Sequence, residues 1–205
     1  MATSDRSSWV NTTHDWAAEV DHNHLETVRR AAAGYAPSGV LHLVLEVLAY
    51  AEDEAEALGR TGACLVVLHA DGSLSVSDDG RGTDTRRDAT GDIIRKPVMS
   101  TADLRFFDSS DVDLPDGHPR RGISVVAALS RWLVHTNRRA EGSWTQRYEL
   151  GVPTTGLVPV WSSGTTGTLV HFLPDRLLLP RPADADELRD LATRFSWLDV
   201  GVATE

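Results

Sequence analysis

The stretch SVSDDGRGTD, from Ser75 to Asp84, follows an apolar run and a tight turn and sets two adjacent carboxylates beside two glycines. A carboxylate at the end of a strand can accept a hydrogen bond from the exocyclic amine of adenine. Glycines beside it let the backbone approach a flat ring or a phosphate without an intervening side chain. Because Asp-Asp-Gly is also an ordinary turn, the rest of the chain must decide between a binding site and a turn.

Periodicity predicts two helices before this stretch and a β-hairpin that leads into it. Apolar residues at three- and four-residue spacing indicate helices from about His24 to Gly34 and from Val40 to Leu58. The runs Ala63–His69 and Leu74–Val76 are typical of strands, and Asp71-Gly72 between them favours a tight hairpin turn.

The remainder of the chain predicts a long loop, two more helices and three more strands. Thr83 to Pro119 has little periodicity, so we expect a loop that could act as a lid, with a short helix near Ile93 to Leu104. The other predicted elements are helices at Ile123–Val134 and Asp184–Leu198 and strands at Trp132–Asn137, Trp144–Leu150 and Thr168–Leu173. This order predicts an α+β fold with helices on one face of a sheet.

The composition favours one domain with an acidic surface. The chain has 205 residues, a formal net charge of −10 and no run of lysine or arginine longer than a pair, so we expect no direct binding to DNA. One cysteine excludes an internal disulfide, and the first residues match neither a signal peptide nor a membrane span. We therefore expect a cytoplasmic protein with no membrane partner, an N-terminal arm at residues 1–20 and a domain at residues 21–205.

Several motifs, taken in order, resemble a known family. They are HLVLE (42–46), LHADGSLSV (68–76), DDGRG (78–82), SVVAALS (124–130), YELGVP (148–153), TGTLVHFLP (166–174) and FSWLDVGV (195–202). Together they resemble the gyrase-B-type ATPase domain of the GHKL family, from about His24 to Val202. The resemblance implies a two-layer Hsp90/gyrase-B-type (Bergerat) fold with an ATP site between the helices and a mixed, mainly antiparallel sheet.

The resemblance also implies roles for individual residues. Asp78 matches the adenine-binding aspartate, Gly80 and Gly82 the glycines beneath the nucleotide, and Thr168 the threonine that joins Asp78 around a bound water. Glu46 matches the general base, and His42, one helical turn earlier, can hydrogen-bond Glu46 and fix its rotamer. Without the surrounding motifs, His42 and Glu46 would be interpreted as a surface ion pair.

Other positions depart from the family pattern on the phosphate side. Tyr50 stands where the family has the asparagine that coordinates magnesium, and a phenol is a poor ligand for that small cation. The glycine-rich lid motif appears as Gly117-His-Pro-Arg-Arg-Gly122, in which Pro119 removes a backbone donor and Arg120 replaces a glycine. Magnesium binding is therefore doubtful, and we expect no metal ligands, although Arg120 and Arg121 could offer charge to phosphates.

Two further departures border the adenine pocket. Asp84 stands where the family has a proline, and Thr145 stands where it has an arginine at the pocket mouth. The resemblance covers neither the transducer domain, with its phosphate-contacting lysine, nor the DNA-cleavage regions. We therefore expect that the chain does not act as a complete topoisomerase subunit.

Three hypotheses follow from this pattern. The first is a stand-alone nucleotide-binding domain that binds ATP or ADP weakly, hydrolyses little or none, and acts by binding a protein partner. The second is a slow ATPase in which Arg120 and Arg121 replace the missing cation, and retention of Glu46 and His42 supports it. The third is a binder of another small molecule in the former adenine pocket.

Overall fold

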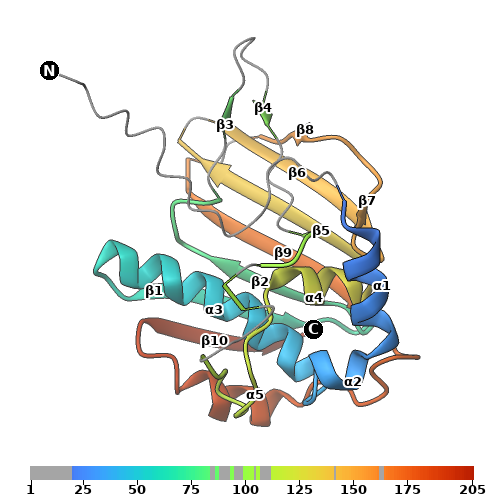
Figure 1. Cartoon of the computed structure of the whole chain (residues 1–205). Coiled ribbons are helices and arrows are strands. Elements are labelled where there is room, and N and C mark those ends of the chain that lie inside the picture. Colours follow the sequence, from blue (N-terminus) through green and yellow to red (C-terminus); the bar gives the residue numbers. More distant parts are fainter. Residues whose placement is uncertain are drawn as a thin grey trace, which may run out of the picture.

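An eight-stranded mixed sheet forms one layer of the molecule (Figure 1). The computed structural model describes residues 20–83, 86–87, 93–94, 99–103, 105–106, 112–140, 142–161 and 164–205. The strands of the sheet are β1 (Gly62–Leu68), β2 (Leu74–Asp78), β5 (Ser130–Arg139), β6 (Gly142–Glu149), β7 (Val152–Pro153), β8 (Val158–Pro159), β9 (Gly167–Pro174) and β10 (Leu198–Thr204). They run in the order β10-β1-β2-β9-β5-β6-β7, with β8 beside β6. A separate two-stranded sheet pairs β3 (Arg86–Arg87) with β4 (Ile93–Ile94).

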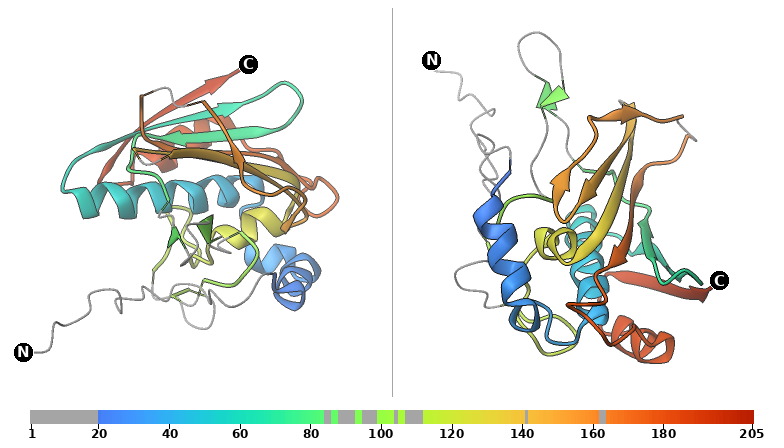
Figure 2. Two further views of the ribbon diagram at one scale, coloured as in Figure 1. Left: turned by 90° about the horizontal axis from the view of Figure 1, so that it is seen from above. Right: turned by 90° about the vertical axis from the view of Figure 1, so that its right-hand side faces the viewer.

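The second layer consists of helices on one face of the large sheet (Figure 2). The helices are α1 (His22–Arg30), α2 (Ala32–Tyr35), α3 (Val40–Leu58), α4 (Ile123–Ala128) and α5 (Ala185–Ala192). Helix α3 packs on β1 and β2, α4 packs on β5, α1 packs on α4, and α5 packs on β10. The predicted α+β class, with a mixed and mainly antiparallel sheet, is confirmed, since β1 and β10 are parallel and the other pairs of this sheet are antiparallel.

Helix α3 has the predicted bounds and carries much of the core. It ends at Gly59, whose φ of 64° lies in the left-handed region, and whose N–H donates to the carbonyl oxygens of Ala55 and Glu56. Burial covers more than one face of the helix, because the sheet lies on one side and α4 with its preceding loop on the other. Two of the buried residues, His42 and Glu46, are polar and fully enclosed.

The predicted hairpin places Asp78 at the end of β2, an interior strand of the sheet. Gly72 has a φ of 83° in the turn between β1 and β2, as the Asp-Gly dipeptide predicts. The register pairs Ser77 of β2 with Leu169 of β9, so the end of β2 lies against the start of β9. Asp78 and Thr168, ninety residues apart in sequence, thereby become neighbours.

Two predicted helices extend too far. Helix α4 ends at Ala128 instead of Val134, because residues from Ser130 onward pair with β6 on one side and β9 on the other. Helix α5 ends at Ala192 instead of Leu198, and the unpredicted strand β10 begins at Leu198. Those residues pair in parallel with β1, a partner that is distant in sequence and that local periodicity does not reveal.

The region after the opening stretch also differs from expectation. The short helix predicted near Ile93 to Leu104 is wrong in its described part, where Ile93–Ile94 form a strand and residues 99–101 form turns and bends. Residue 104 and residues 95–98 lie outside the described residues, as does the N-terminal arm up to residue 19. In the part of the chain that the structure describes, no helix is long and apolar enough to cross a membrane.

Candidate functional site

Asp78 is the last residue of β2, and its carboxylate is partly enclosed. Oδ1 accepts a hydrogen bond from the N–H of Gly80 at 2.8 Å, and Oδ2 accepts one from the N–H of Thr168 at 3.3 Å. The hydroxyl of Thr168 also donates directly to Oδ2. Burial raises the pKa of Asp78 above its ordinary value, although these hydrogen bonds oppose the shift. Within the described residues, no arginine or lysine forms an ion pair with this carboxylate.

Two glycines allow close backbone contacts, one with Asp78 itself and one in the loop that follows it. Gly167 has a φ of 131°, and a Cβ there would lie 2.0 Å from the carbonyl oxygen of Asp78. Gly82 has a φ of 82°, and a Cβ there would lie 2.6 Å from Oδ1 of Asn137. The same Asn137 oxygen accepts the N–H of Thr83 at 2.7 Å, so a side chain from β5 holds the end of the loop. The two glycines are therefore required by close contacts within the chain itself.

An ion pair that the sequence does not predict holds the same loop to α3. Arg81 donates from Nε to Oε1 of Glu54 at 2.6 Å and from Nη2 to Oε2 at 3.0 Å. The Arg81 guanidinium lowers the pKa of Glu54, outweighing the opposing effect of partial burial. The two residues lie 27 positions apart, and no local spacing indicates that they meet.

Glu46 and His42 lie on α3, one turn apart and fully buried. Nε2 of His42 is 3.5 Å from Oε1 of Glu46, while Nδ1 is 2.7 Å from Oδ2 of Asp116. His42 therefore bridges two carboxylates, of which the sequence predicts only Glu46. Burial lowers the pKa of His42, but the hydrogen bond to Asp116 and the nearby acidic groups of Asp116 and Glu46 outweigh it and raise the pKa to about 9. The two acidic neighbours therefore favour the protonated form of His42.

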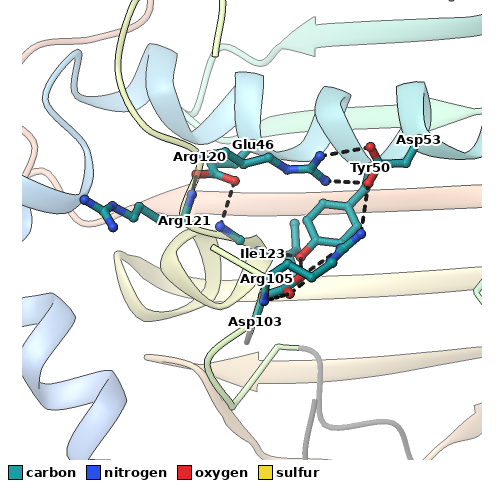
Figure 3. Close-up of polar contacts among 9 residues, drawn as sticks. Glu46, Tyr50, Asp53, Asp103, Arg105, Arg120, Arg121 and Ile123 are labelled. Atoms are coloured by element: carbon teal, nitrogen blue, oxygen red, sulfur yellow. Dashed lines mark hydrogen bonds and ion pairs between the residues drawn. The ribbon is translucent and has the colours of Figure 1, made fainter. Parts of the chain in front are cut away.

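The carboxylate of Glu46 also binds the chain just before α4. Oε1 accepts the N–H of Arg121 at 2.5 Å, and Oε2 accepts the N–H of Gly122 at 2.9 Å (Figure 3). Gly122 is the N-cap of α4 and has no side chain to cap the helix. Glu46 therefore performs the capping from α3, and these two backbone donors at the helix start are already satisfied.

Tyr50, one turn after Glu46, joins a group of charged side chains. Its hydroxyl donates to Oδ2 of Asp103 at 2.6 Å, and burial raises the pKa of Tyr50 further above its ordinary range. Arg105 donates to the same Asp103 carboxylate from Nε at 3.1 Å and from Nη2 at 2.8 Å. Asp103 is fully buried, and its pKa is lowered by these partners despite its burial.

Arg120 completes this group from the other side of the Tyr50 ring. It donates to both carboxylate oxygens of Asp53, at 2.9 Å and 2.8 Å. Its guanidinium carbon lies 4.7 Å from the ring centre of Tyr50 and 4.4 Å from that of Phe106. Figure 3 shows Arg120, Tyr50, Asp53, Asp103 and Arg105 converging, whereas the side chain of Arg121 points away from Tyr50.

Three other positions from the sequence analysis are Gly117, Thr145 and Asp84, and the structure describes the first two of them. Gly117 has a φ of 78° in the turn before α4, and its N–H donates to the carbonyl oxygen of Leu114 at 2.8 Å. Thr145 lies on β6, where its hydroxyl is 3.1 Å from that of Thr136 and 3.2 Å from the carbonyl oxygen of His135. Asp84 lies outside the described residues.

Most partners of His42, Tyr50 and Arg120 could not be predicted from the sequence. These residues are Asp53, Asp103, Arg105, Phe106 and Asp116. Asp53 sits one helical turn after the predicted Tyr50 position, which is a usable signal. The others lie between residues 83 and 119, where the absence of a period leaves no basis for placing a side chain.

The fold and this arrangement define a class of protein. A mixed, mainly antiparallel sheet under a helical layer, with Asp78 at a central strand end and Glu46 on the helix above it, is the arrangement of the gyrase-B-type GHKL ATPase fold. No protein-family model matches the chain.

Curated relatives agree with this class. The chain is 33% identical over 194 residues to the DNA gyrase B protein of Thermotoga maritima and 39% identical over 164 residues to the mitochondrial DNA gyrase B protein of Arabidopsis thaliana. It is 35% identical over 157 residues to the DNA topoisomerase 4 B protein of Bacillus subtilis. The matches cover 88%, 74% and 74% of this chain but only 29%, 22% and 24% of those proteins. The chain is thus a homologue of a domain-sized part of the B subunits of DNA gyrase and topoisomerase IV.

Proposed function

We propose that the chain is an adenine-binding domain of the gyrase-B type, with Asp78 as the acceptor for the exocyclic amine. The observation that carries this proposal is the Asp78 carboxylate at the end of β2, held by the N–H of Gly80 and by Thr168. A carboxylate has about four acceptor positions, and the described residues use three of them, which leaves one for a ligand donor. Homology to the B subunits of DNA gyrase supports adenine as that ligand.

The phosphate side of the site does not fit magnesium and a triphosphate. Tyr50 donates its hydroxyl to Asp103, and Glu46 takes the backbone N–H groups of Arg121 and Gly122. Among the described residues, no group of three or more His, Cys, Asp or Glu side chains is placed to hold a metal ion. Phosphoryl transfer depends on positioning and charge neutralisation, so we propose that the domain does not hydrolyse ATP at a useful rate.

A domain of this kind would act by binding a partner. The net charge of −10 favours a protein partner over DNA, whose phosphates would be repelled. We infer that occupancy of the adenine side, rather than turnover, would be the signal read by that partner.

Ligand-induced stabilisation tests the adenine side. A ligand that binds only the folded state raises the melting temperature by mass action. We expect millimolar ATP or ADP to raise it for the wild type, and Asp78→Asn to remove the shift. Asp79→Asn is the matched control, because Asp79 pairs with Arg60 and accepts the N–H of Ala63 on β1 instead of facing Thr168. No shift in the wild type would refute nucleotide binding.

A phosphate-release assay tests the second candidate, a slow ATPase. The observation that favours it is the buried Asp116–His42–Glu46 arrangement, which is typical of a polarised general base. We expect release no faster than background, and the same result for Glu46→Gln. A measurable rate that Glu46→Gln abolishes would establish turnover, and Arg120→Ala and Arg121→Ala would then identify the source of the missing charge.

A further inference from the structure

We propose that the site selects adenine compounds that carry no polyphosphate, adenosine above all, and discriminates against ATP. This inference rests on the proposed adenine-binding function and adds the ligand class. It follows from six residues, which we call the arginine cluster; two lie on α3, three lie at positions 103, 105 and 106, and one lies just before α4. They are Tyr50, Asp53, Asp103, Arg105, Phe106 and Arg120.

The charges of the arginine cluster are balanced internally. Arg120 makes a two-point contact with Asp53, and Arg105 makes a two-point contact with Asp103. Arg105 also reaches Asp53 at 3.4 Å. Two guanidinium groups therefore face two carboxylates, and the cluster has no net positive charge with which to neutralise a triphosphate.

The Tyr50 hydroxyl and the terminal arginine nitrogens of the cluster also donate hydrogen bonds within the cluster. Tyr50 donates to Asp103, and each terminal nitrogen of the two arginines donates to a carboxylate. Within the described residues, Nε of Arg120 is the cluster's buried donor that has no hydrogen-bond partner. The arginine nitrogens are thus directed at the cluster's own carboxylates and do not form a cradle for several phosphate oxygens.

The cluster is packed as well as charge-balanced. Arg120 is 4% exposed and Phe106 is 7% exposed, with the guanidinium of Arg120 against the Phe106 and Tyr50 rings. The guanidinium of Arg105 also lies over the Phe106 ring, 4.6 Å from the ring centre. A triphosphate would have to separate stacked, ion-paired groups before it could bind, which leaves buried charges without partners.

Glu46 occupies the backbone donors at the start of α4. Its two carboxylate oxygens accept the N–H groups of Arg121 and Gly122, so a phosphate would meet a carboxylate instead of free amides. The phosphate side therefore disfavours anions, while Asp78 and Thr168 remain as a site for a base. Adenosine uses the base site and places no charge on the phosphate side.

Isothermal titration calorimetry with four ligands tests the inference. The ligands are adenosine, ADP, ATP, and ATP with magnesium, titrated into the whole chain at one pH. We expect adenosine to bind at least about tenfold more tightly than ATP, with less than about a twofold effect of magnesium. Tyr50→Asn and Arg120→Gly, which open the cluster, should raise ATP affinity relative to adenosine by about tenfold. Arg189→Gln is the control, because Arg189 pairs with Asp186 on α5, outside both the cluster and the loop that follows Asp78.

The outcomes separate this inference from the function on which it rests. If ATP with magnesium binds more tightly than adenosine, the ligand class is wrong while adenine binding stands. If no ligand binds at millimolar concentration, the proposed function itself fails. If the cluster variants do not fold, the ratio of adenosine to ATP affinity in the wild type still tests the ligand class. Loss of binding in Asp78→Asn would then show that the ligand binds at this site.

Discussion

The proposed adenine side around Asp78 and the proposed phosphate side around Tyr50 both border α3, yet they are built in different ways. At Asp78, a single carboxylate is held by one hydroxyl and by backbone N–H groups, with glycines that allow the chain to approach closely. At Tyr50, two arginines, two carboxylates and two aromatic rings satisfy one another. The first side keeps an acceptor for a ligand, and the second uses its polar groups internally.

The comparison shows that the strand pairing fixes one side of the candidate site, whereas side-chain contacts between α3 and the chain before α4 fix the other. The sheet register places Asp78 beside Thr168 whatever happens near α4, because β2 pairs with β9 along its length. The start of α4, by contrast, is held by side chains of α3, so new side chains there change what the site can bind. Substitutions near the start of α4 can therefore change these contacts without a change in the strand pairing.

Gly167→Ala should have the largest effect and tests how rigidly the adenine side is held. The new Cβ would lie 2.0 Å from the backbone oxygen of Asp78, and the φ of 131° is unfavourable for a side chain. Because the backbone cannot move aside without breaking the β2–β9 pairing, we expect a loss of about 3–5 kcal/mol in the free energy of unfolding, measured by urea denaturation.

Gly34→Ala is the matched control for Gly167→Ala. Nothing lies within 4 Å of a Cβ at Gly34, which sits in α2 without a positive φ. We expect a change of less than about 1 kcal/mol, in the stabilising direction. Equal stabilities for Gly167→Ala and the wild type would show that the adenine side is loosely packed, and the contrast between the two sides would disappear.

The pH dependence of stability tests the buried charges on the phosphate side. The pKa of His42 is raised from 6.5 to about 9 by Asp116 and Glu46 against the effect of burial, with the ring of His118 also nearby. The folded state therefore holds a proton more tightly than the unfolded state. Its stabilisation is complete below about pH 6.5 and is lost as the pH rises through 9, a change of about 3 kcal/mol.

Urea denaturation at about pH 6.5, 7.5 and 9 measures this effect. Asp116→Asn removes one carboxylate partner of His42 but keeps the shape of the side chain, so the decline over this range should become shallower. The pKa of His135 is lowered to about 4 by burial, so that residue affects stability only at lower pH. A wild-type stability that is flat or rises over this range would mean that His42 is neutral.

The strand pairing and the helix lengths show which parts of the fold can be predicted from the sequence and which cannot. Helix α3 and the β1–β2 hairpin follow from local signals, namely apolar spacing, Gly59 and the Asp-Gly turn, and their predictions are confirmed. Strand β10 and the end of α4 depend on partners distant in sequence, so local periodicity predicts helix where pairing gives strand.

The residues of the candidate site also fall into a group that the sequence predicts and a group that it does not. Asp78, Thr168, Glu46 and His42 could be named because motifs around them match a family. The pairing of Arg120 with Asp53 could not, because it joins a helix to a segment that has no period. A role for Arg120 in binding phosphate remains a prediction, and it now requires the residue to leave Asp53.

A double-mutant cycle on Tyr50 and Asp103 tests whether the phosphate side is stabilising. Their side chains are joined by a hydrogen bond of 2.6 Å, and Asp103 is fully buried. We expect Tyr50→Phe and Asp103→Asn to show a coupling of about 1–2 kcal/mol in the free energy of unfolding, as for a hydrogen bond to a charged group. A coupling near zero would indicate that the hydrogen bond between Tyr50 and Asp103 does not stabilise the folded protein.

The ion pair between Arg81 and Glu54 should have the smallest effect, although it has short distances and lies next to Asp78. The Arg81 side chain is 58% exposed, so water and salt screen the attraction that lowers the pKa of Glu54. We expect a coupling of about 0.2–1 kcal/mol between Arg81→Gln and Glu54→Gln, measured by urea denaturation and reduced in about 1 M salt. Screening leaves the buried Tyr50–Asp103 bond unchanged, so the salt dependence separates the two sides of the site. A coupling above that of Tyr50 and Asp103 would reverse the comparison, because the adenine side would then be the one held by charge.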